Sequence, residues 1–553
     1  MVSLRNSLCG KDVLIDELHY LLCNCWNGDG VPQDMRDCKI NTLYKNKGDM
    51  SDCNNYRGIA LLSVVGKLFA RVVLMRLQKL AERVYPESQC GFRAERSTID
   101  MIFSLRQLQE KCREQRKPLY MAFIDLTKAF DLVSRNGLFQ ILDKIGCPPK
   151  LLNMVKSFHV GMKGFVQFDG MVSSAFDITS GVKQGCVLAP TLFGIFFSVM
   201  LKQAFGHSSE GVYLHSRSSG GLFNLSRLKA KTKRIESLIR ELLFADDAAI
   251  VSHSEEELQS MMEKFSNACR AFGLTISIKK TKVMVQGTED SPEILVDGTA
   301  LDVEDDFTYL GSVMSNDLSL EKELNRRIGR ACNTFARLTE RVWENSKLTI
   351  NTKIAVYKAC VLSTLLYGSE SWTLYSHQQN KLEVFHMKHL RLILNIRWDD
   401  YITNTEVLEK AKIFSLHTIL LQRRLRWLGH VHRMPEERIP KKLLYGQLAD
   451  GSRSLGRPHL RFRDVCKRDL ENTGIGSKGW ERLASNRSQW RSEVYKGMER
   501  AEKDRREKAA EKRERRKEKK LSTPIPSAHI CNRCGRDCHA PIGLASHVRS
   551  CKV

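Results

Sequence analysis

The stretch 242–251, Leu-Leu-Phe-Ala-Asp-Asp-Ala-Ala-Ile-Val, constrains the chain more than any other. Short apolar runs flank Asp246 and Asp247, a pattern that predicts two buried strands joined by a tight turn. Adjacent carboxylates on such a hairpin repel each other unless a cation lies beside them. A hard cation such as magnesium is a natural partner because it takes oxygen ligands. An Asp-Asp pair alone is also typical of a solvated turn, so the rest of the chain must decide.

The net charge of the chain limits the kinds of binding partner that we expect. The 553 residues carry a formal net charge of +25, and such an excess indicates a polyanionic partner, usually nucleic acid, although a merely soluble basic protein is the alternative. The 17 cysteines are scattered without a dense framework, which is typical of a reducing compartment. No run approaches the ~18 apolar residues of a membrane span. We therefore expect an intracellular, soluble protein of several domains.

A third carboxylate follows a second apolar run. Residues 119–124 have the pattern of a buried strand that delivers Asp125 at its end. Strand ends can aim a side chain rigidly while leaving it accessible to a substrate. Phe130 lies five residues further on, and Ser134 is a suitable cap for the next helix.

Two helices and two arginines precede that strand. We predict a helix from Ser63 to about Arg83, with Leu68, Val72, Met75 and Leu80 as its apolar stripe, and a second helix from 97 or 98 to about 115. Arg57 and Arg93 each lie in a glycine-flanked segment that we predict to be a non-helical loop. A guanidinium there suits bidentate phosphate contact, and a surface arginine is the alternative.

Three later segments add candidate ligand contacts. Residues 181–190 place two glycines around Lys183 and Gln184, which allows close approach of the backbone at Gly185 to a ligand. Residues 274–284 have the pattern of a strand, a basic turn that contains Lys280, and another strand. Residues 206–234 are rich in Ser, Gly, Lys and Arg, and we expect a basic surface insertion there.

The C-terminal third is basic. Residues 320–480 are helical in pattern, and the segments 366–372, 426–430 and 456–463 interleave aromatic with cationic residues. Such residues stack on bases and hold phosphates, but core aromatics on basic helices have the same pattern. Residues 501–520 carry 11 Lys or Arg against 6 Asp or Glu, which predicts a solvated helix or a disordered linker.

The last residues have the ligand spacing of a zinc finger. Cys531, Cys534, His547 and Cys551 follow the pattern Cys-x2-Cys-x12-His-x3-Cys. Thiolates and an imidazole at this spacing can complete a zinc tetrahedron, and so short a segment needs a metal because it has no core of its own. Cys538 occupies the usual aromatic position, so we expect an unusual finger.

Seven motifs in order resemble the reverse transcriptases of non-LTR (LINE-type) retrotransposons. The resemblance covers about 35–480 and rests on the sequences Asn-Tyr-Arg-Gly-Ile-Ala-Leu-Leu-Ser, Gln-Cys-Gly-Phe-Arg, Phe-Ile-Asp-Leu-Thr-Lys-Ala-Phe-Asp, Gly-Val-Lys-Gln-Gly, Phe-Ala-Asp-Asp, Gly-Leu-Thr-Ile-Ser-Ile-Lys-Lys-Thr-Lys and Tyr-Leu-Gly. Two positions depart from the family, which usually has proline at Gly58 and asparagine at Ser277. Neither change removes a catalytic group.

The resemblance implies an α+β polymerase right hand with fingers, a palm built on an antiparallel sheet, and a helical thumb. The implied domains are a lead-in (1–34), fingers (35–118), palm (119–318), thumb and basic region (319–480), charged helix or linker (481–526) and C2HC zinc finger (527–553).

It also implies the roles of the site residues. Asp125, Asp246 and Asp247 would hold two Mg2+ ions about 3.5–4 Å apart, with Asp247 in support. Lys280 would protonate the departing pyrophosphate. Phe130 would block a ribose 2′-hydroxyl, Gln184 and Gly185 would line the nucleotide pocket, and Arg57 and Arg93 would contact the triphosphate. One Zn2+ would occupy the C-terminal finger.

The implied activity is RNA-directed DNA polymerisation, with an RNA template, a DNA primer or target DNA, and deoxynucleoside triphosphates as partners. Family members usually carry an endonuclease domain before the polymerase. We see none in this sequence, so we expect either a 5′-shortened copy or an endonuclease supplied in trans. We expect assembly in the cytoplasm and action in the nucleus. The alternatives are an inactive or co-opted relict that only binds nucleic acid, and a splicing-related maturase.

Overall fold

A five-stranded sheet forms the centre of the molecule in a computed structural model that describes residues 11–28, 30–217, 221–224, 226, 233–451, 453, 456, 458–522, 529–538 and 540–551. The strand order is β14-β11-β3-β10-β9. Their bounds are β3 Leu119–Ile124, β9 Glu241–Phe244, β10 Asp247–Ser252, β11 Lys282–Gln286 and β14 Asp302–Val303. All neighbours are antiparallel except β14, which runs parallel to β11. The predicted strand 119–124 is confirmed.

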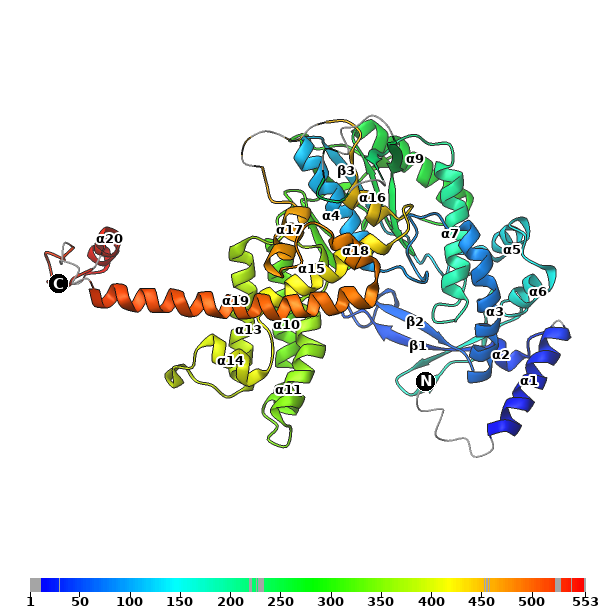
Figure 1. The fold of residues 1–553 in the computed structure, drawn as a ribbon. Coiled ribbons are helices and arrows are strands. Elements are labelled where there is room, and N and C mark those ends of the chain that lie inside the picture. The colour runs from blue at the N-terminus through cyan, green and yellow to red at the C-terminus, as the bar shows by residue number, and fades with distance from the viewer. Residues whose placement is uncertain are drawn as a thin grey trace.

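Alternation along β3 sends its side chains into two hydrophobic cores. Ala122 and Ile124 pack with helices α7 (Ala189–Phe205) and α9 (Glu255–Ala271). Met121 and Phe123 pack on the opposite face with α4 (Thr98–Gln115). Both faces of the sheet are therefore covered by helices (Figure 1).

A second sheet lies beside the first and is joined to α3. It has the order β2-β1-β4-β5, with β6 also paired to β4. Its strands are β1 Cys38–Tyr44, β2 Tyr56–Leu61, β4 Lys163–Phe168, β5 Met171–Val172 and β6 Phe176–Asp177. The accompanying helices are α1 Lys11–Asn27, α2 Gln33–Arg36, α3 Val64–Val84, α5 Arg135–Lys144 and α6 Pro149–Ser157. Smaller pairs are β7 Val212–Ser216 with β8 Ile235–Ile239 and β17 Gln447–Leu448, β12 Leu295–Val296 with β13 Thr299–Ala300, and β15 Asp306–Tyr309 with β16 Ser312–Ser315.

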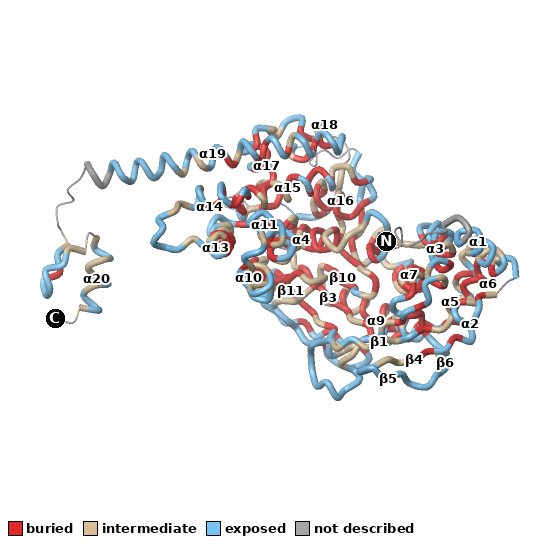
Figure 2. The backbone as a smooth tube through the Cα atoms, turned by 90° about the horizontal axis from the view of Figure 1, so that it is seen from below, coloured by how far each residue is buried: buried red, intermediate tan, exposed pale blue. Residues whose placement is uncertain are grey.

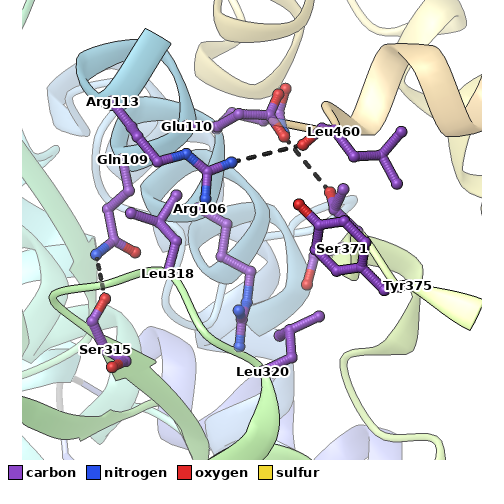
Figure 3. Close-up of a pocket in the computed structure, with 12 residues that line it drawn as sticks. Arg106, Gln109, Glu110, Arg113, Ser315, Leu318, Leu320, Ser371, Tyr375 and Leu460 are labelled. Carbon is purple, nitrogen blue, oxygen red and sulfur yellow. Dashed lines mark hydrogen bonds between the residues drawn. The ribbon is translucent and has the colours of Figure 1, made fainter. Parts of the chain in front are cut away.

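Helix α4 joins the N-terminal half of the chain to its C-terminal half. Its polar side chains are buried and bond to distant backbone: Arg106 donates to the Val313 carbonyl at 2.9 Å, and Lys111 donates to the Gly446 carbonyl at 2.7 Å. Figure 3 shows Glu110 and Arg113 turned toward a cavity of about 40 Å³ walled by Ser315 and Leu460. Burial raises the pKa of Glu110, whose carboxylate accepts from the Phe462 N–H at 2.8 Å. These bonds fix β16 and the segment around 460 against the central sheet.

The C-terminal third is helical, as its sequence pattern predicts. Its helices are α10 Glu321–Ala336, α11 Ile350–Val356, α12 Ser363–Leu365, α13 Ser376–Ile393, α14 Asn404–Ala411, α15 Leu416–Arg433, α16 Ile439–Tyr445, α17 Phe462–Asn472, α18 Trp480–Ser485, α19 Arg487–Ser522 and α20 Pro541–Ser550. Short helical turns occur at Cys53–Asn55, Thr339–Trp343, Tyr357–Leu362, Ser369–Ser371 and Trp398–Asp400. No helix among the described residues is long and apolar enough to cross a bilayer.

The charged segment is a helix, and it begins before the charge run. Helix α19 starts at Arg487, and its first turns bury Trp490, Val494 and Met498 against α15 and α18. Its distal half is exposed and extends away from the rest of the molecule toward the C-terminal segment (Figures 1 and 2). The disordered-linker alternative is wrong for the described part, 487–522.

Three local predictions are wrong. In α3 the predicted Leu80 is buried, but it shares the buried face with Phe69, Val73 and Leu77, whereas the predicted Leu68 and Met75 are exposed. This helix has apolar residues on several faces, so periodicity alone selected the wrong stripe. The first strand predicted in 274–284 is a single bridge between Leu126 and Ile276. The insertion at 206–234 is not only surface: Val212 and Leu214 are buried in β7, although 218–220, 225 and 227–232 lie outside the described residues.

Other local predictions are confirmed. Ser63 caps α3 by accepting from the Gly66 N–H, and Ser134 caps α5 by accepting from the Gly137 N–H. Helix α4 begins after Ser97 and ends at Gln115. The predicted 456–463 segment includes Arg457, which lies outside the described residues.

Candidate active site

The Asp-Asp pair lies at a two-residue turn between β9 and β10. Phe244 pairs with Asp247, so the turn itself consists of Ala245 and Asp246. Ala245 has φ of +60°, in the left-handed region that β-hairpin turns of this length require. A residue with a Cβ is disfavoured there by about 1–2 kcal/mol. Neighbouring groups must therefore hold the turn in shape.

The side chain of Gln89 stabilises the turn at Ala245. Its Oε1 accepts from the Ala245 N–H at 2.9 Å, and its Nε2 donates to the Ala245 carbonyl at 3.1 Å. The Gln89 side chain is fully buried. Beside it, a Cβ on Gly91 would lie 2.2 Å from the Ala245 nitrogen, so only glycine fits this approach. The motif that contains Gln89 was recognised in the sequence, but this role was not, because the two partners are 156 residues apart.

Asp125 reaches the same end of the sheet from β3. Ile124 pairs with Ala248 in antiparallel register, so the next residue of β3 lies at the level of Asp247. The Asp125 N–H donates to Thr281 Oγ1 at 3.3 Å, and its carbonyl accepts from the Ser277 N–H at 2.9 Å. The structure thus brings together three carboxylates from segments about 120 residues apart in the chain.

The pKa values of the turn carboxylates reflect this crowding. Burial and the charge of Asp125 raise the pKa of Asp246, although nearby Arg57 and Lys280 oppose this. Desolvation, followed by the charges of Asp246 and Asp125, raises the pKa of Asp247 to about 6. A bound cation would relieve this repulsion, so the three carboxylates fit a divalent metal.

Lys280 forms an ion pair with this carboxylate cluster. Its Nζ donates to Asp125 Oδ1 at 2.9 Å, and its side chain is 65% exposed. The ammonium group therefore contacts an oxygen that a metal ligand would use. An exposed lysine can change rotamer at little cost, so the bond does not block access of an ion to Asp125.

The predicted nucleotide-binding residues lie on connected segments. Arg57 is on strand β2, opposite Leu43, and not on a loop as predicted. The Gln184 carbonyl accepts from the Ala60 N–H of the same strand at 2.8 Å. A Cβ on Gly185 would lie 2.8 Å from the Ala60 carbonyl oxygen, and its φ is +103°. Gln184 and Gly185 are exposed, so this loop presents its backbone and an amide to solvent beside Arg57.

Phe130 is tied to that loop. Its carbonyl accepts from the Val182 N–H at 2.9 Å. The ring stacks on Phe193 with centroids 4.5 Å apart and an interplanar angle of 22°. The residue is half-buried, so part of a fixed ring remains accessible.

Arg93 differs from the other predicted contacts. Its guanidinium donates to the Pro86 and Gln89 carbonyls at 2.9 and 3.0 Å, and it pairs with Glu82 at 2.8 Å. The side chain is only 7% exposed and lies over the Tyr85 ring. Arg93 thus supports the loop that carries Gln89, and its triphosphate contact stays a prediction.

The four predicted zinc ligands meet at the C-terminus. The ligand atoms of Cys531, Cys534, His547 and Cys551 all lie within 4.8 Å of one another. Cys534 Sγ is 3.0 Å from His547 Nε2, and Cys531 Sγ is 4.0 Å from Cys551 Sγ. Backbone N–H groups of Cys534 and Arg533 lower the pKa of the Cys531 thiol. Two cysteines, a histidine and a third cysteine at this spacing fit zinc.

Comparisons with known proteins agree with the motif order. Residues 44–314 match the family described as reverse transcriptase (RNA-dependent DNA polymerase). The chain is 26% identical over 362 residues to the RNA-directed DNA polymerase from mobile element jockey of Drosophila funebris, covering 63% of this chain and 36% of that protein. It is 25% identical over 343 residues to the Pol polyprotein of retrotransposable element R2 of Popillia japonica, covering 60% and 44%.

The chain spans less than half the length of these relatives. Among solved structures, apo telomerase from Candida tropicalis aligns over 56% of this chain and 59% of its own, with 15% identity and a TM-score of 0.36. A likeness this distant carries no argument. The family match covers the central sheet, the carboxylates and their supporting loops, in the α+β right-hand architecture of polymerases. Residues 44–314 therefore form a reverse transcriptase domain, and the chain is similar to the polymerases of the mobile elements jockey and R2.

Proposed function

We propose that this protein is an RNA-directed DNA polymerase that extends a DNA primer along an RNA template. The observation that carries the proposal is the meeting of Asp125, Asp246 and Asp247 at one end of the sheet formed by β3 and β10. Burial and the repulsion of neighbouring carboxylates raise the pKa values of Asp246 and Asp247, which supports a site that is complete only with cations. The proposed partners are an RNA template, a DNA primer and deoxynucleoside triphosphates.

In this proposal Asp125 and Asp246 are the principal ligands of two magnesium ions, and Asp247 supports them. When bound, magnesium would activate the primer hydroxyl and stabilise the charge of the departing pyrophosphate. Gln89 keeps the turn rigid, so the Asp246 carboxylate is held in one place during turnover. Lys280 is within reach of the same carboxylates and can give a proton to pyrophosphate.

The remaining residues would select the nucleotide. Arg57 contributes positive charge beside Asp246 and is exposed, so it can contact a triphosphate. Gln184 and Gly185 line the same side, tied to β2 by the bond to Ala60. The ring of Phe130, fixed by Phe193, would exclude a ribose 2′-hydroxyl. Fingers (35–118), palm (119–318) and thumb (319–480) remain the proposed domain limits.

Primer extension tests the proposal. Purified full-length protein should extend a DNA primer on an RNA template in magnesium, and Asp246→Asn should not, at unchanged affinity for the primer–template. The Asn variant keeps the size of the side chain and removes its charge, so a loss of synthesis reports the ligand role. If the wild-type protein binds RNA but extends no primer while a control polymerase does, the nucleic-acid-binding relict becomes the better reading. Pre-nicked and intact target DNA would show whether an endonuclease acts in trans.

We also propose one zinc ion in the C-terminal segment, held by Cys531, Cys534, His547 and Cys551. The close approach of the four ligand atoms supports this. The wild-type protein should contain one zinc per chain by metal analysis. Cys534→Ser should lose it, whereas Cys538→Ser should retain it. Equal zinc content in both variants would refute the site. A nuclear location stays a prediction that imaging of the tagged chain can check.

A further inference from the structure

A groove of about 1170 Å³ lies outside the carboxylate cluster, between α15, the start of α19 and the turn at 95–97. Its lining has nine lysine or arginine side chains against two glutamates. Three of the nine are neutralised: Arg96 and Arg438 pair with Glu87, and Arg423 pairs with Glu370. The other six make no ion pair with any described residue: Lys358, Lys412, Arg426, Arg433, Arg487 and Arg491. The groove is therefore strongly cationic.

Helical spacing places these cations in two rows. On α15 the groove-lining positions 423, 426, 430 and 433 recur every three or four residues and lie on one face. On α19 Arg487, Arg491 and Tyr495 recur every four residues. No acidic residue occupies the first turn of α19, whose helix dipole adds further positive potential there.

Close packing brings the two rows to one groove. The Trp490 indole N–H donates to the Leu425 carbonyl at 3.0 Å. A Cβ on Gly429 would lie 2.2 Å from the same indole nitrogen, so glycine is needed for α19 to approach α15 this closely. Both ribbon views place the two helices side by side (Figures 1 and 2). Burial, and after it the charge of Arg487, lowers the pKa of Arg433, so these two cations from the two rows lie close to each other.

Aromatic residues at the groove suit unpaired bases. Tyr495 is 48% exposed beside Arg491, and Phe414 is half-buried at the rim. Trp427, which the sequence pattern left open as a stacking residue, is instead a core residue packed on Phe103 with ring centroids 5.5 Å apart. Cations in rows with accessible aromatic rings are the features of surfaces that bind single strands, because a duplex hides its base faces.

We propose that this groove binds single-stranded RNA, namely template that is not yet paired with the new DNA strand. The assignment to template RNA rests on the proposed function, since in RNA copying the unpaired strand is the template. The loop that holds the catalytic turn through Gln89 continues to the groove at Glu95, Arg96 and Ser97. Phosphates would lie along the two cation rows, and bases would stack on Tyr495 and Phe414.

The test uses two matched triple variants of the full-length protein. The groove variant is Arg426→Gln, Arg487→Gln and Arg491→Gln. The control removes the same charge from the distal part of α19, with Lys512→Gln, Arg515→Gln and Arg516→Gln, all exposed outside the groove. All substituted side chains are exposed, so both proteins should unfold at the wild-type temperature.

The readout is the affinity for a primer–template with a long single-stranded RNA overhang, measured against salt concentration. The groove variant should bind about ten- to a hundredfold more weakly at 150 mM salt, with a log–log salt slope lower by about 2, or 0.7 per lost phosphate contact. The control should change far less. Equal salt slopes for the two variants would refute RNA binding in the groove.

Two further arms test the occupant. With a blunt primer–template, the groove variant should bind like the wild type, and an equal loss there would overturn single-strand binding. With a DNA overhang of the same sequence the loss should be similar, because phosphate contacts and base stacking do not depend on the sugar, and a loss larger with DNA than with RNA would overturn the assignment to RNA. Because every readout is binding, a wild-type protein that fails to extend primers would refute the proposed function without deciding this test.

Discussion

The carboxylate cluster is negatively charged and the α15–α19 groove is positively charged, but both sites carry an excess of one charge. At the end of β3 and β10, burial and neighbouring carboxylates raise the pKa values of Asp246 and Asp247, and Lys280 supplies the one ion pair that the three carboxylates make with the described residues. In the groove, six cations have no carboxylate partner among the described residues. Each cluster is imbalanced and reaches solvent, so each is suited to an external ligand of the opposite charge.

Buried charges in the same molecule behave differently. Arg424 lies on α15 two residues before Arg426, yet it is 2% exposed and forms a two-bond pair with Asp469 at 2.7 and 3.3 Å. Burial of an unpaired charge would cost several kcal/mol. The fold therefore gives the buried Arg424 a carboxylate partner, whereas the six groove cations, which reach solvent, have none among the described residues. The contrast separates structural charges from binding charges, and the predictions below test it.

The largest effect is expected at the carboxylates. Asp125→Asn and Asp246→Asn should each reduce the primer-extension rate by about a thousandfold, since a metal-bound site contributes several kcal/mol to the transition state. Asp247→Asn should reduce it less, by about ten- to a hundredfold. Steady-state extension at saturating primer–template measures this.

The same substitutions should not destabilise the metal-free protein. Removing one of three like charges relieves repulsion, so Asp246→Asn should unfold at a temperature equal to or slightly above the wild type in chelator. A clear drop in the unfolding temperature would mean that the carboxylate is structural, and the contrast with Arg424 would fail.

The next effect separates two arginines of one helix. Arg424→Met should reduce the free energy of unfolding by about 3–5 kcal/mol, because it leaves the buried Asp469 unpaired. Arg426→Gln should change it by no more than about 0.5 kcal/mol, because its side chain is exposed. Urea unfolding of both variants compares them, and similar losses would refute the division into structural and binding charges.

The sequence predicts the parts of the site that follow from local pattern. Apolar runs that end in a carboxylate identify β3 and the β9–β10 hairpin, and with them Asp125, Asp246 and Asp247. Capping serines mark the starts of α3 and α5 because a cap is a contact across three residues. The zinc-ligand spacing likewise lies within one short segment.

Long-range contacts account for what the sequence leaves out. The two hydrogen bonds between Gln89 and Ala245 join residues 156 positions apart, so no periodic pattern in the sequence predicts them. The burial of Arg93 depends on Glu82 and Tyr85 packing beneath it, so its residue type alone suggested a ligand contact. The groove exists only because Gly429 admits Trp490, a tertiary contact between helices. One signal was available for Gln89: a polar residue two positions before a glycine in a motif that also contains Arg93.

A smaller effect is expected from the support of the turn. Gln89→Met keeps the length of the side chain but removes both bonds to Ala245, so the left-handed turn should lose rigidity. We expect kcat to fall about ten- to a hundredfold, since misplacement by about 1 Å can cost a hundredfold. KM and template affinity should stay unchanged.

Gln286→Met is the matched control for Gln89→Met. Gln286 is also buried and donates to a backbone carbonyl, that of Gln109, but it pairs with Leu119 at the opposite end of β3. This variant should lose stability without a specific loss of kcat. If both glutamine variants lose kcat equally after correction for folding, the positioning role of Gln89 is wrong.

The smallest effect is a pH dependence that the buried core should show and the groove should not. Burial lowers the pKa of His386 to about 4, and its ring contacts the Tyr357 hydroxyl at 3.0 Å, with Glu383, His389 and Glu502 as the charged or titratable groups nearby.

A lowered native pKa means that the unfolded chain takes up the proton first, so stability is complete above about pH 6.5 and falls as the pH drops toward 4. Between pH 7.5 and 5.5 this histidine should cost about 1.4 kcal/mol, one pKa unit. His386→Asn should lose that part of the pH dependence in urea unfolding. RNA affinity of the folded protein should barely change over the same range, because the groove cations are arginines and lysines and burial holds the pKa of the groove-lining His430 below its usual value. A wild-type pH slope retained by the variant would show that His386 titrates normally, and a steep fall in RNA affinity at pH 5.5 would place a titrating group among the groove contacts.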